Sequence, residues 1–320
     1  MTGVQTCALP ISLSLMDNSA EIALKAAKNE AKAALDGFVD WAVYALGEEL
    51  VTEETEAVAA AIAEVKAVID AAETVEAAKA VFAYNAQAEG EKWTSGNDNE
   101  GMPYKQKIMT AVETAAAAAK AEAEAAKNVQ LDGVAMTLAE AIEKAEKGDT
   151  IVLIKDIELK AYLEIKKTLT IDLNGKDIVR ADGTAIYVND ADAVLMIKGE
   201  GAVSCTQAIF ANAGQVRIMD GSYHGTADTI YAMGTGEVRI FGGKFSAELD
   251  KDSFAKAQYP CLNLLDRDKA SASITVYGGA FLEFDPANNV SENPVQSFVA
   301  VGYTSTATPD ADGSIWYVVE

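Results

Sequence analysis

The chain has 320 residues, of which 26 are Lys or Arg and 49 are Asp or Glu, so its formal net charge at pH 7 is −23. This acidity excludes nucleic acid as an expected partner, because phosphate binding needs clustered basic side chains, and it argues against binding to an anionic membrane surface. Three Cys and one His leave little material for thiol or imidazole chemistry, and the apolar run of about 20 residues that membrane insertion requires is absent from the sequence.

The first twelve residues, MTGVQTCALPIS, resemble the translation of a common sequencing adapter, and residues 1–12 are therefore left out of the fold prediction. We expect a chain translated from metagenomic reads, with the true N-terminus and any signal peptide missing upstream. Met16 as the natural start is the alternative, and a protein that began there would lack a secretory signal.

Residues 13–130 have the composition of helices, since Ala, Glu and Lys dominate them. Large apolar residues recur at steps of three and four, as on the buried face of a helix. We predict helices that begin near Asn18, after Thr52, after Thr74 and near Tyr104. Because the last of these contains five consecutive Ala at 115–119, its apolar seam is thin. The pattern predicts an Ala-rich helical bundle or stalk, and a spacer or self-associating role is favoured over specific protein binding.

Residues 131–320 change to short β-type runs and recurrent Gly. Thr137 and Glu140 form a capping-box pattern, which predicts a short helix at 137–147 before a buried strand from Thr150. Four similar segments, LMIKGEG, VRIMDGSY, VRIFGGKF and ITVYGGAF, start at residues 195, 216, 238 and 274, so they lie 21, 22 and 36 residues apart. Such a repeat is typical of a solenoid, in which each coil packs on its neighbours.

The alternation within these segments predicts which side chains face the core. Val216, Val238 and Ile274 are expected to stack inside, whereas Arg217 and Arg239 point outward on neighbouring coils. Gly221, Gly243 and Gly279 recur where the chain must turn a corner.

Three stretches carry a family resemblance: MTLAEAIEKAEKGDTIVLIKDIEL, LTIDLNGKDI, and the ending with FDPANN and SFVAVGY. They resemble the pectate-lyase-like right-handed parallel β-helix proteins of gut Firmicutes and their phages. The resemblance implies a single-stranded parallel β-helix with a capping helix, coils at about 149–284 and a closing module at about 285–320. In that module a hairpin turning at residues 309–313 is expected to cover the last coil with Phe298, Val299, Tyr303, Trp316 and Val318. The predicted fold class is therefore α then β.

Enzymes of this fold need a Ca²⁺ held by carboxylates with a basic side chain, or paired carboxylates on one outward face. The candidates for catalysis are Arg217, Arg239, Asp220 and His224, and the favoured alternative is a surface Arg ladder beside a solvated turn. The runs at 250–252 and 310–313 hint at Ca²⁺ but lack the downstream Glu of an EF-hand loop, so no metal site is assigned. Cys205 and Cys261 are expected to be buried free thiols, because they belong to coils about two apart.

The insertion from Ser246 to Tyr259 accounts for the longest repeat, and insertions in solenoids often carry binding. Its candidate binding residues are Asp250, Asp252, Phe254 and Tyr259, where the aromatic rings would stack on sugars. The alternative is a tolerated long loop.

Two functions follow from these observations. We favour a non-enzymatic, surface-displayed or virion structural protein, adhesin-like or fibre-like, whose β-helix binds a glycan or a host-cell surface. The alternative is a polysaccharide lyase or glycoside hydrolase that acts on acidic polysaccharide. Either protein would be extracellular, on a phage virion or a bacterial cell surface, and a homo-oligomer, by analogy with β-helical fibres a trimer, is a further hypothesis.

Overall fold

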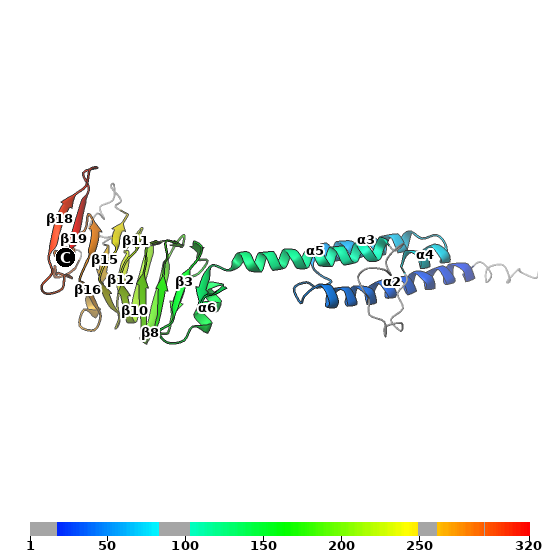
Figure 1. The fold of residues 1–320 in the computed structure, drawn as a ribbon, viewed down its shortest axis with the longest axis horizontal. Coiled ribbons are helices and arrows are strands. Elements are labelled where there is room, and N and C mark those ends of the chain that lie inside the picture. Colours follow the sequence, from blue (N-terminus) through cyan, green and yellow to red (C-terminus); the bar gives the residue numbers. More distant parts are fainter. Residues whose placement is uncertain (1–17, 83–102, 249–260, 291) are drawn as a thin grey trace, which may run out of the picture. The chain divides into compact units, whose positions relative to one another are not determined.

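A computed structural model describes residues 18–82, 103–248, 261–290 and 292–320. The chain divides into two compact units, Met1–Ala125 and Ala126–Glu320. The first unit is helical and the second consists of stacked strands (Figure 1). The predicted order of α then β is therefore confirmed.

The described part of the first unit is a small helical bundle. Its helices are α2 (Asn18–Leu46), α3 (Glu56–Ala71), α4 (Val75–Val81) and α5 (Pro103–Ala126). Thr74 caps α4 as the sequence predicts, because its hydroxyl accepts a hydrogen bond from the Ala77 amide at 3.0 Å. Leu35, Val65 and Ile108 are fully buried and bring α2, α3 and α5 into one core.

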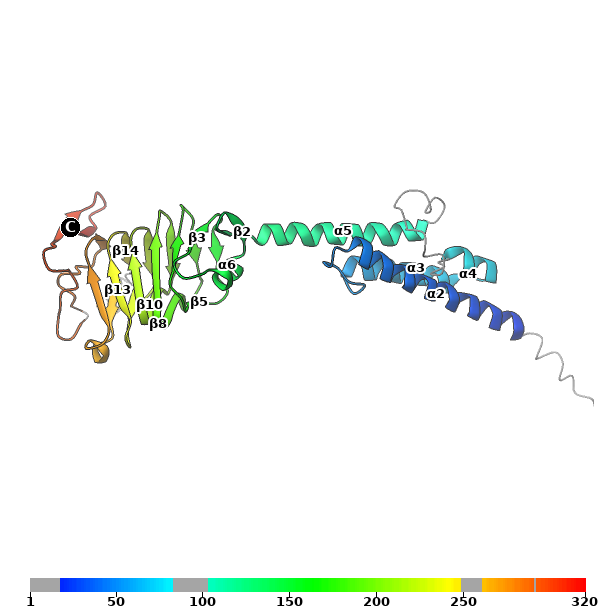
Figure 2. The same ribbon diagram turned by 60° about the horizontal axis from the view of Figure 1, so that its bottom comes forward.

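The second unit is a β-solenoid: its coils from about residue 150 to 247 make about four turns, and strands at residues 262–282 continue the stack. Most of each coil lies in three faces, and the strands of one face are parallel (Figures 1 and 2). Face 1 contains β5 (Leu163–Ile165), the first half of β8 (Thr184–Lys198), the first half of β10 (Gln207–Ile218), β12 (Ile230–Ala232) and β15 (Leu262–Leu264). Face 2 contains β3 (Thr150–Leu153), β6 (Leu169–Asp172), the second halves of β8 and β10, β13 (Glu237–Ile240) and β16 (Ser273–Val276). Face 3 contains β4 (Ile157–Glu158), β7 (Ile178–Val179), β9 (Ala202–Cys205), β11 (Ser222–Gly225), β14 (Lys244–Ala247) and β17 (Gly279–Leu282).

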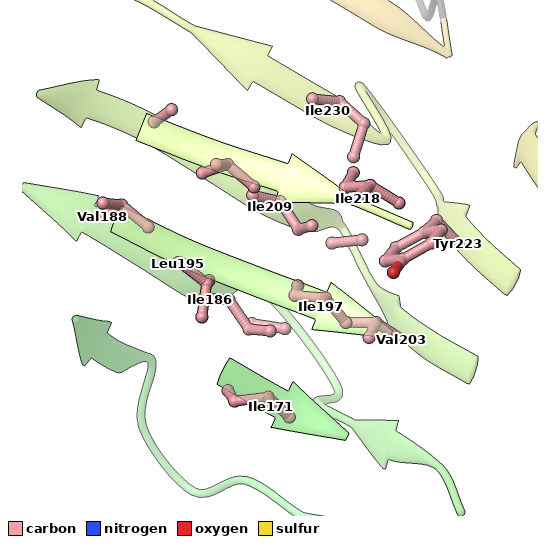
Figure 3. Packing of buried hydrophobic residues seen from close by; sticks show 14 of the residues in the cluster. Ile171, Ile186, Val188, Leu195, Ile197, Val203, Ile209, Ile218, Tyr223 and Ile230 are labelled. Carbon is pink, nitrogen blue, oxygen red and sulfur yellow. The ribbon is translucent and has the colours of Figure 1, made fainter. Parts of the chain in front are cut away.

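Aliphatic side chains at equivalent positions of successive coils form the core. On face 2 one buried row runs through six register partners, Ile151, Ile171, Ile197, Ile218, Ile240 and Val276. Figure 3 shows members of this row on neighbouring strands, with their side chains in the interior. The predicted inward stack of Val216, Val238 and Ile274 is confirmed, as all three are buried and paired in register.

The predicted corner glycines and thiols are confirmed as well. Gly221, Gly243 and Gly279 have φ of 101°, 102° and 116°, a region that side chains other than Gly rarely adopt. Cys205 and Cys261 are buried and free. Burial raises the pKa of the Cys261 thiol to about 12, which keeps it unreactive.

The N-terminal end of the solenoid is closed by α6 (Leu138–Lys144), whose Leu138 and Ala141 are buried (Figure 2). The predicted capping box is present, with the Thr137 and Glu140 side chains each bonded to the other's backbone amide. The helix is shorter than the predicted 137–147, because the backbone leaves the helical conformation at its C-cap, Ala145, with φ −57° and ψ 134°. A hairpin that the sequence analysis did not anticipate, β1 (Val129–Leu131) and β2 (Val134–Met136), precedes it and pairs antiparallel with β3.

The C-terminal end closes with the predicted hairpin, β18 (Ser305–Pro309) and β19 (Ile315–Val319). β19 extends face 3 by pairing antiparallel with β17, so Tyr317 and Val319 join the core. The prediction that Trp316 and Val318 cover the coil is therefore wrong by one residue. Neighbouring side chains of a strand point to opposite sides, so their neighbours Tyr317 and Val319 face the core instead. Phe298 is buried and Val299 packs on the core as expected, whereas Tyr303 stays 42 % exposed and packs on Tyr277.

Within the described residues, no helix combines the length and the apolar character needed to cross a membrane.

Replacing Ile197 by Ala removes a fully buried link from the face 2 row. We expect the free energy of unfolding of the β unit to fall by about 2–5 kcal/mol, because lost transfer free energy and a cavity add together. Chemical denaturation followed by far-UV circular dichroism measures it. Met196→Ala, on the outward side of the same strand, should cost clearly less. Equal losses for the two variants would contradict the assignment of inward and outward faces.

Candidate functional site

The outward side of face 1 carries a row of aromatic side chains that runs from coil to coil. Tyr187, Phe210 and Tyr231 are register partners on β8, β10 and β12, and Tyr162 precedes β5 on the adjoining coil. The ring centroids of successive members lie 5.6, 5.0 and 5.1 Å apart, in the order Tyr162, Tyr187, Phe210, Tyr231. Tyr162 is 51 % exposed and the other three are half-buried, so the row lies at the protein surface.

The sequence places these rings outward by a simple local pattern. In AIYV, AIFA and TIYA the ring is flanked on both sides by residues that are fully buried, such as Ile209 and Ala211 around Phe210. The ring at the third position must therefore point to solvent. The sequence analysis used these segments only as repeat markers, although the recurrence of an aromatic residue at 187, 210 and 231 was the signal that could have revealed the row.

A row of polar side chains runs along one flank of the aromatic row. Gln207 pairs in register with Thr184, whose hydroxyl donates a hydrogen bond to Gln207 Oε1 at 3.0 Å. Asp228, in the turn before β12, receives side-chain hydrogen bonds from Gln207 and Asn263. Each of these amides is thus held at one end. We call Thr184, Gln207, Asp228 and Asn263 the polar row; the first three flank the aromatic row, whereas Asn263 is the register partner of Tyr231 and lies in line with the rings on the next coil.

Asp228 is the least usual member of this polar row. Burial raises the pKa of its carboxyl group, the negative charge of Glu292 raises it further, and the hydrogen bonds from Asn263 and Gln207 oppose the rise. Its Oδ1 atom is buried and has no hydrogen-bond partner among the described residues. A carboxylate perturbed by burial beside an exposed row of rings is typical of a functional site.

The opposite flank also carries side-chain amides. Asn212 Nδ2 donates a hydrogen bond to Asn189 Oδ1 at 2.6 Å, where β8 and β10 bend from face 1 into face 2. The aromatic row is therefore bordered on both sides by groups that donate and accept hydrogen bonds.

The predicted Arg candidates lie on face 2. Arg217 and Arg239 are register partners on β10 and β13, as expected. Arg217 Nε donates to Gln215 Oε1, and Arg239 Nε forms an ion pair with Glu237 Oε1 at 2.5 Å. Gln215 Nε2 donates in turn to Glu237 Oε2, so a network within the protein connects the two guanidinium groups.

The other catalytic candidates lie elsewhere on the coil. Asp220 is exposed at the corner after β10, where its Oδ1 accepts a hydrogen bond from the Gly221 amide at 2.8 Å. His224 lies on β11 of face 3, and its Nδ1 is 3.0 Å from Ser246 Oγ. The structure thus distributes Arg217, Asp220 and His224 over face 2, a corner and face 3.

The predicted binding residues Asp250, Asp252, Phe254 and Tyr259 lie outside the described residues. In the second Ca²⁺ candidate, Asp312 Oδ1 accepts hydrogen bonds from the amide and hydroxyl of Ser314, which hold the hairpin turn. Within the described ranges, no group of three or more His, Cys, Asp or Glu side chains is placed to hold a metal ion.

Comparisons with family models, with curated proteins and with solved structures found no match to this chain. The geometry of the site therefore carries the functional argument.

The raised pKa of Asp228 predicts the direction of a pH effect on stability. The folded state holds the Asp228 proton more tightly than the unfolded chain, whose Asp pKa is about 3.9, so the stability due to this proton is lost as the pH rises through and above that value. Asp228→Asn cannot titrate. We expect the free energy of unfolding of the wild type to exceed that of the variant by more at pH 4 than at pH 7. Urea denaturation at the two pH values measures this difference. A difference that is constant or grows with pH would contradict the raised pKa.

Proposed function

We propose that this protein is a non-enzymatic glycan-binding module in which the β-solenoid presents the outward side of face 1 to its ligand. The observation that carries the proposal is the surface row Tyr162, Tyr187, Phe210 and Tyr231. The apolar C–H faces of sugar rings pack on aromatic side chains, and sugar hydroxyls bond to amides and carboxylates at the border. Large aromatic side chains gathered at a surface and rimmed by polar groups are typical of ligand-binding sites.

Aromatic pairs across strands also stabilise a sheet, and this contribution does not compete with binding. Two features favour a binding role in addition. The interplanar angles of 88°, 41° and 41° show that the rings are tilted and do not stack flat on one another, so part of each ring face is turned away from its neighbour. The flanking amides are fixed by hydrogen bonds to other side chains, which lowers the entropy lost when a ligand binds.

The setting of this module belongs to the same proposal. We place the protein outside the cell, on a bacterial surface or a phage virion, with the helical unit as a stalk or anchor and a homo-oligomer, a trimer, as its assembled form. The last turns of α5, residues 120–126, are exposed on all sides, which suits a spacer. Sedimentation that gives a monomer would reject the assembly.

Removing either central ring should weaken binding. We expect Tyr187→Ala and Phe210→Ala each to weaken glycan binding by about tenfold or more, because central aromatic contacts often contribute over about 1.4 kcal/mol. A glycan array identifies ligands for the full chain, and titration calorimetry compares the variants with it.

Phe241→Ala is the matched control for these two variants. Phe241 is 40 % exposed and stacks on Tyr277 with ring centroids 4.9 Å apart, but it follows β13 at the corner between faces 2 and 3. It should leave binding unchanged. An array without any bound glycan would reject the proposal, and release of reducing or unsaturated sugars that is lost in Arg217→Ala would replace it with the enzymatic alternative.

A further inference from the structure

We propose that the ligand is an uncharged, extended glycan that lies along the solenoid axis on face 1, and that Asp228 is the positioning residue of this site. This inference rests on the proposed function and specifies its ligand class. It combines the spacing of the aromatic row, the chemistry of its borders and the charges around it.

The spacing of the rings fixes the direction of the ligand. Successive centroids lie 5.0–5.6 Å apart, close to the strand separation of about 4.8 Å that the coils impose. An extended chain of β-linked pyranoses advances by a similar distance with each sugar. A chain along the axis therefore meets one ring per sugar, whereas a chain across the face would meet a single ring.

The borders match the hydroxyls of such a chain. The polar row on one side and Asn189 with Asn212 on the other run in the same direction as the aromatic row. Hydroxyl and amide groups both donate and accept hydrogen bonds, as sugar hydroxyls do. A sugar stacked on Tyr187, Phe210 or Tyr231 would therefore find a polar partner at its edge.

The charges on this face favour an uncharged ligand over an anionic one. Three cations beside these rows are paired within the protein: Lys166 with Glu164 at 2.8 Å, Arg180 with Asp182 at 3.6 Å and Arg267 with Asp268 at 3.4 Å. At the distal end of the row the negative charges of Asp228 and Asp268 act on Tyr231, and the positive charge of Arg267 opposes them. Two negative charges against one positive charge disfavour a sugar carboxylate at that end.

Asp228 acts through its neighbours. Its carboxyl group accepts hydrogen bonds from Gln207 and Asn263, which lie on the coils before and after it. Each amide carries a second N–H beside the one that bonds to Asp228, and in this proposal the second N–H meets the ligand. Because the Oδ1 atom is buried, Asp228 holds these amides in place and does not itself contact the glycan.

The test is an array of linear glycans, neutral and uronic-acid-containing, in matched length series from two to six sugars, probed with the full chain. We expect neutral glycans to bind at least tenfold more tightly than anionic ones at physiological salt. Affinity should rise with each sugar up to four, the number of rings in the row, and then level off.

Each result separates this inference from the proposed function. Tighter binding of anionic glycans that still depends on Tyr187 would overturn the inference and leave the function intact. Binding that does not depend on length would overturn the axial arrangement. An array with no bound glycan rejects both.

The role of Asp228 is tested with Asp228→Asn against Asp156→Asn, an exposed carboxylate at the corner before β4. We expect the first variant to lose about tenfold in affinity for the neutral series and to reduce the ratio of neutral to anionic binding, and the second to change neither. A merely structural Asp228 would leave that ratio unchanged, and this result would overturn the assignment.

Discussion

The stacking of equivalent apolar side chains between neighbouring coils is the constraint on which the rest of the β unit depends. Ile197 and Ile218 are fully buried in a core to which all three faces contribute, and each is stacked between register partners on the coils above and below. This requirement fixes the register, and the register fixes every outward residue at the strand spacing of about 4.8 Å. The aromatic row and the polar row are thus consequences of the same stacking that forms the core.

Stacking of this kind leaves an unpaired edge at the last coil, and each face closes that edge differently. Face 3 is closed by β19, and face 2 by residues 298–300, whose backbone bonds to Val276. On face 1, side chains replace a strand: Asn289 donates to the Leu262 carbonyl at 3.4 Å, and Glu292 accepts from the Leu264 amide at 3.1 Å. Lys269 compensates the buried Glu292 charge at 2.9 Å. These contacts protect an edge that would otherwise pair with another chain.

Most of the fold could be predicted from the sequence, because the repeat reports the register directly. The inward stacks, the corner glycines and the Thr137 capping box all depend on local spacing. The hairpin at the C-terminus was displaced by one residue, since its side-chain parity is set by pairing with β17, which no local pattern reveals. The β1–β2 hairpin was missed although its turn residues, Asp132 and Gly133, form a familiar hairpin signal and both have positive φ.

The site was the least predictable part. Outward exposure alone does not distinguish side chains that bind a ligand from side chains that are already bonded to neighbours within the protein. Arg217 and Tyr187 both point outward at a recurrent position, and the sequence favoured the charged residue. The structure separates them by their partners: Arg217 and Arg239 are engaged by Gln215 and Glu237, whereas the aromatic row turns part of its ring surface to solvent. An anionic ligand on face 2 would have to displace an ion pair within the protein, at a cost that an apolar sugar surface on face 1 does not meet. An outward row of charges that are paired within the protein is therefore a poorer candidate for ligand binding than an outward row of partly exposed rings.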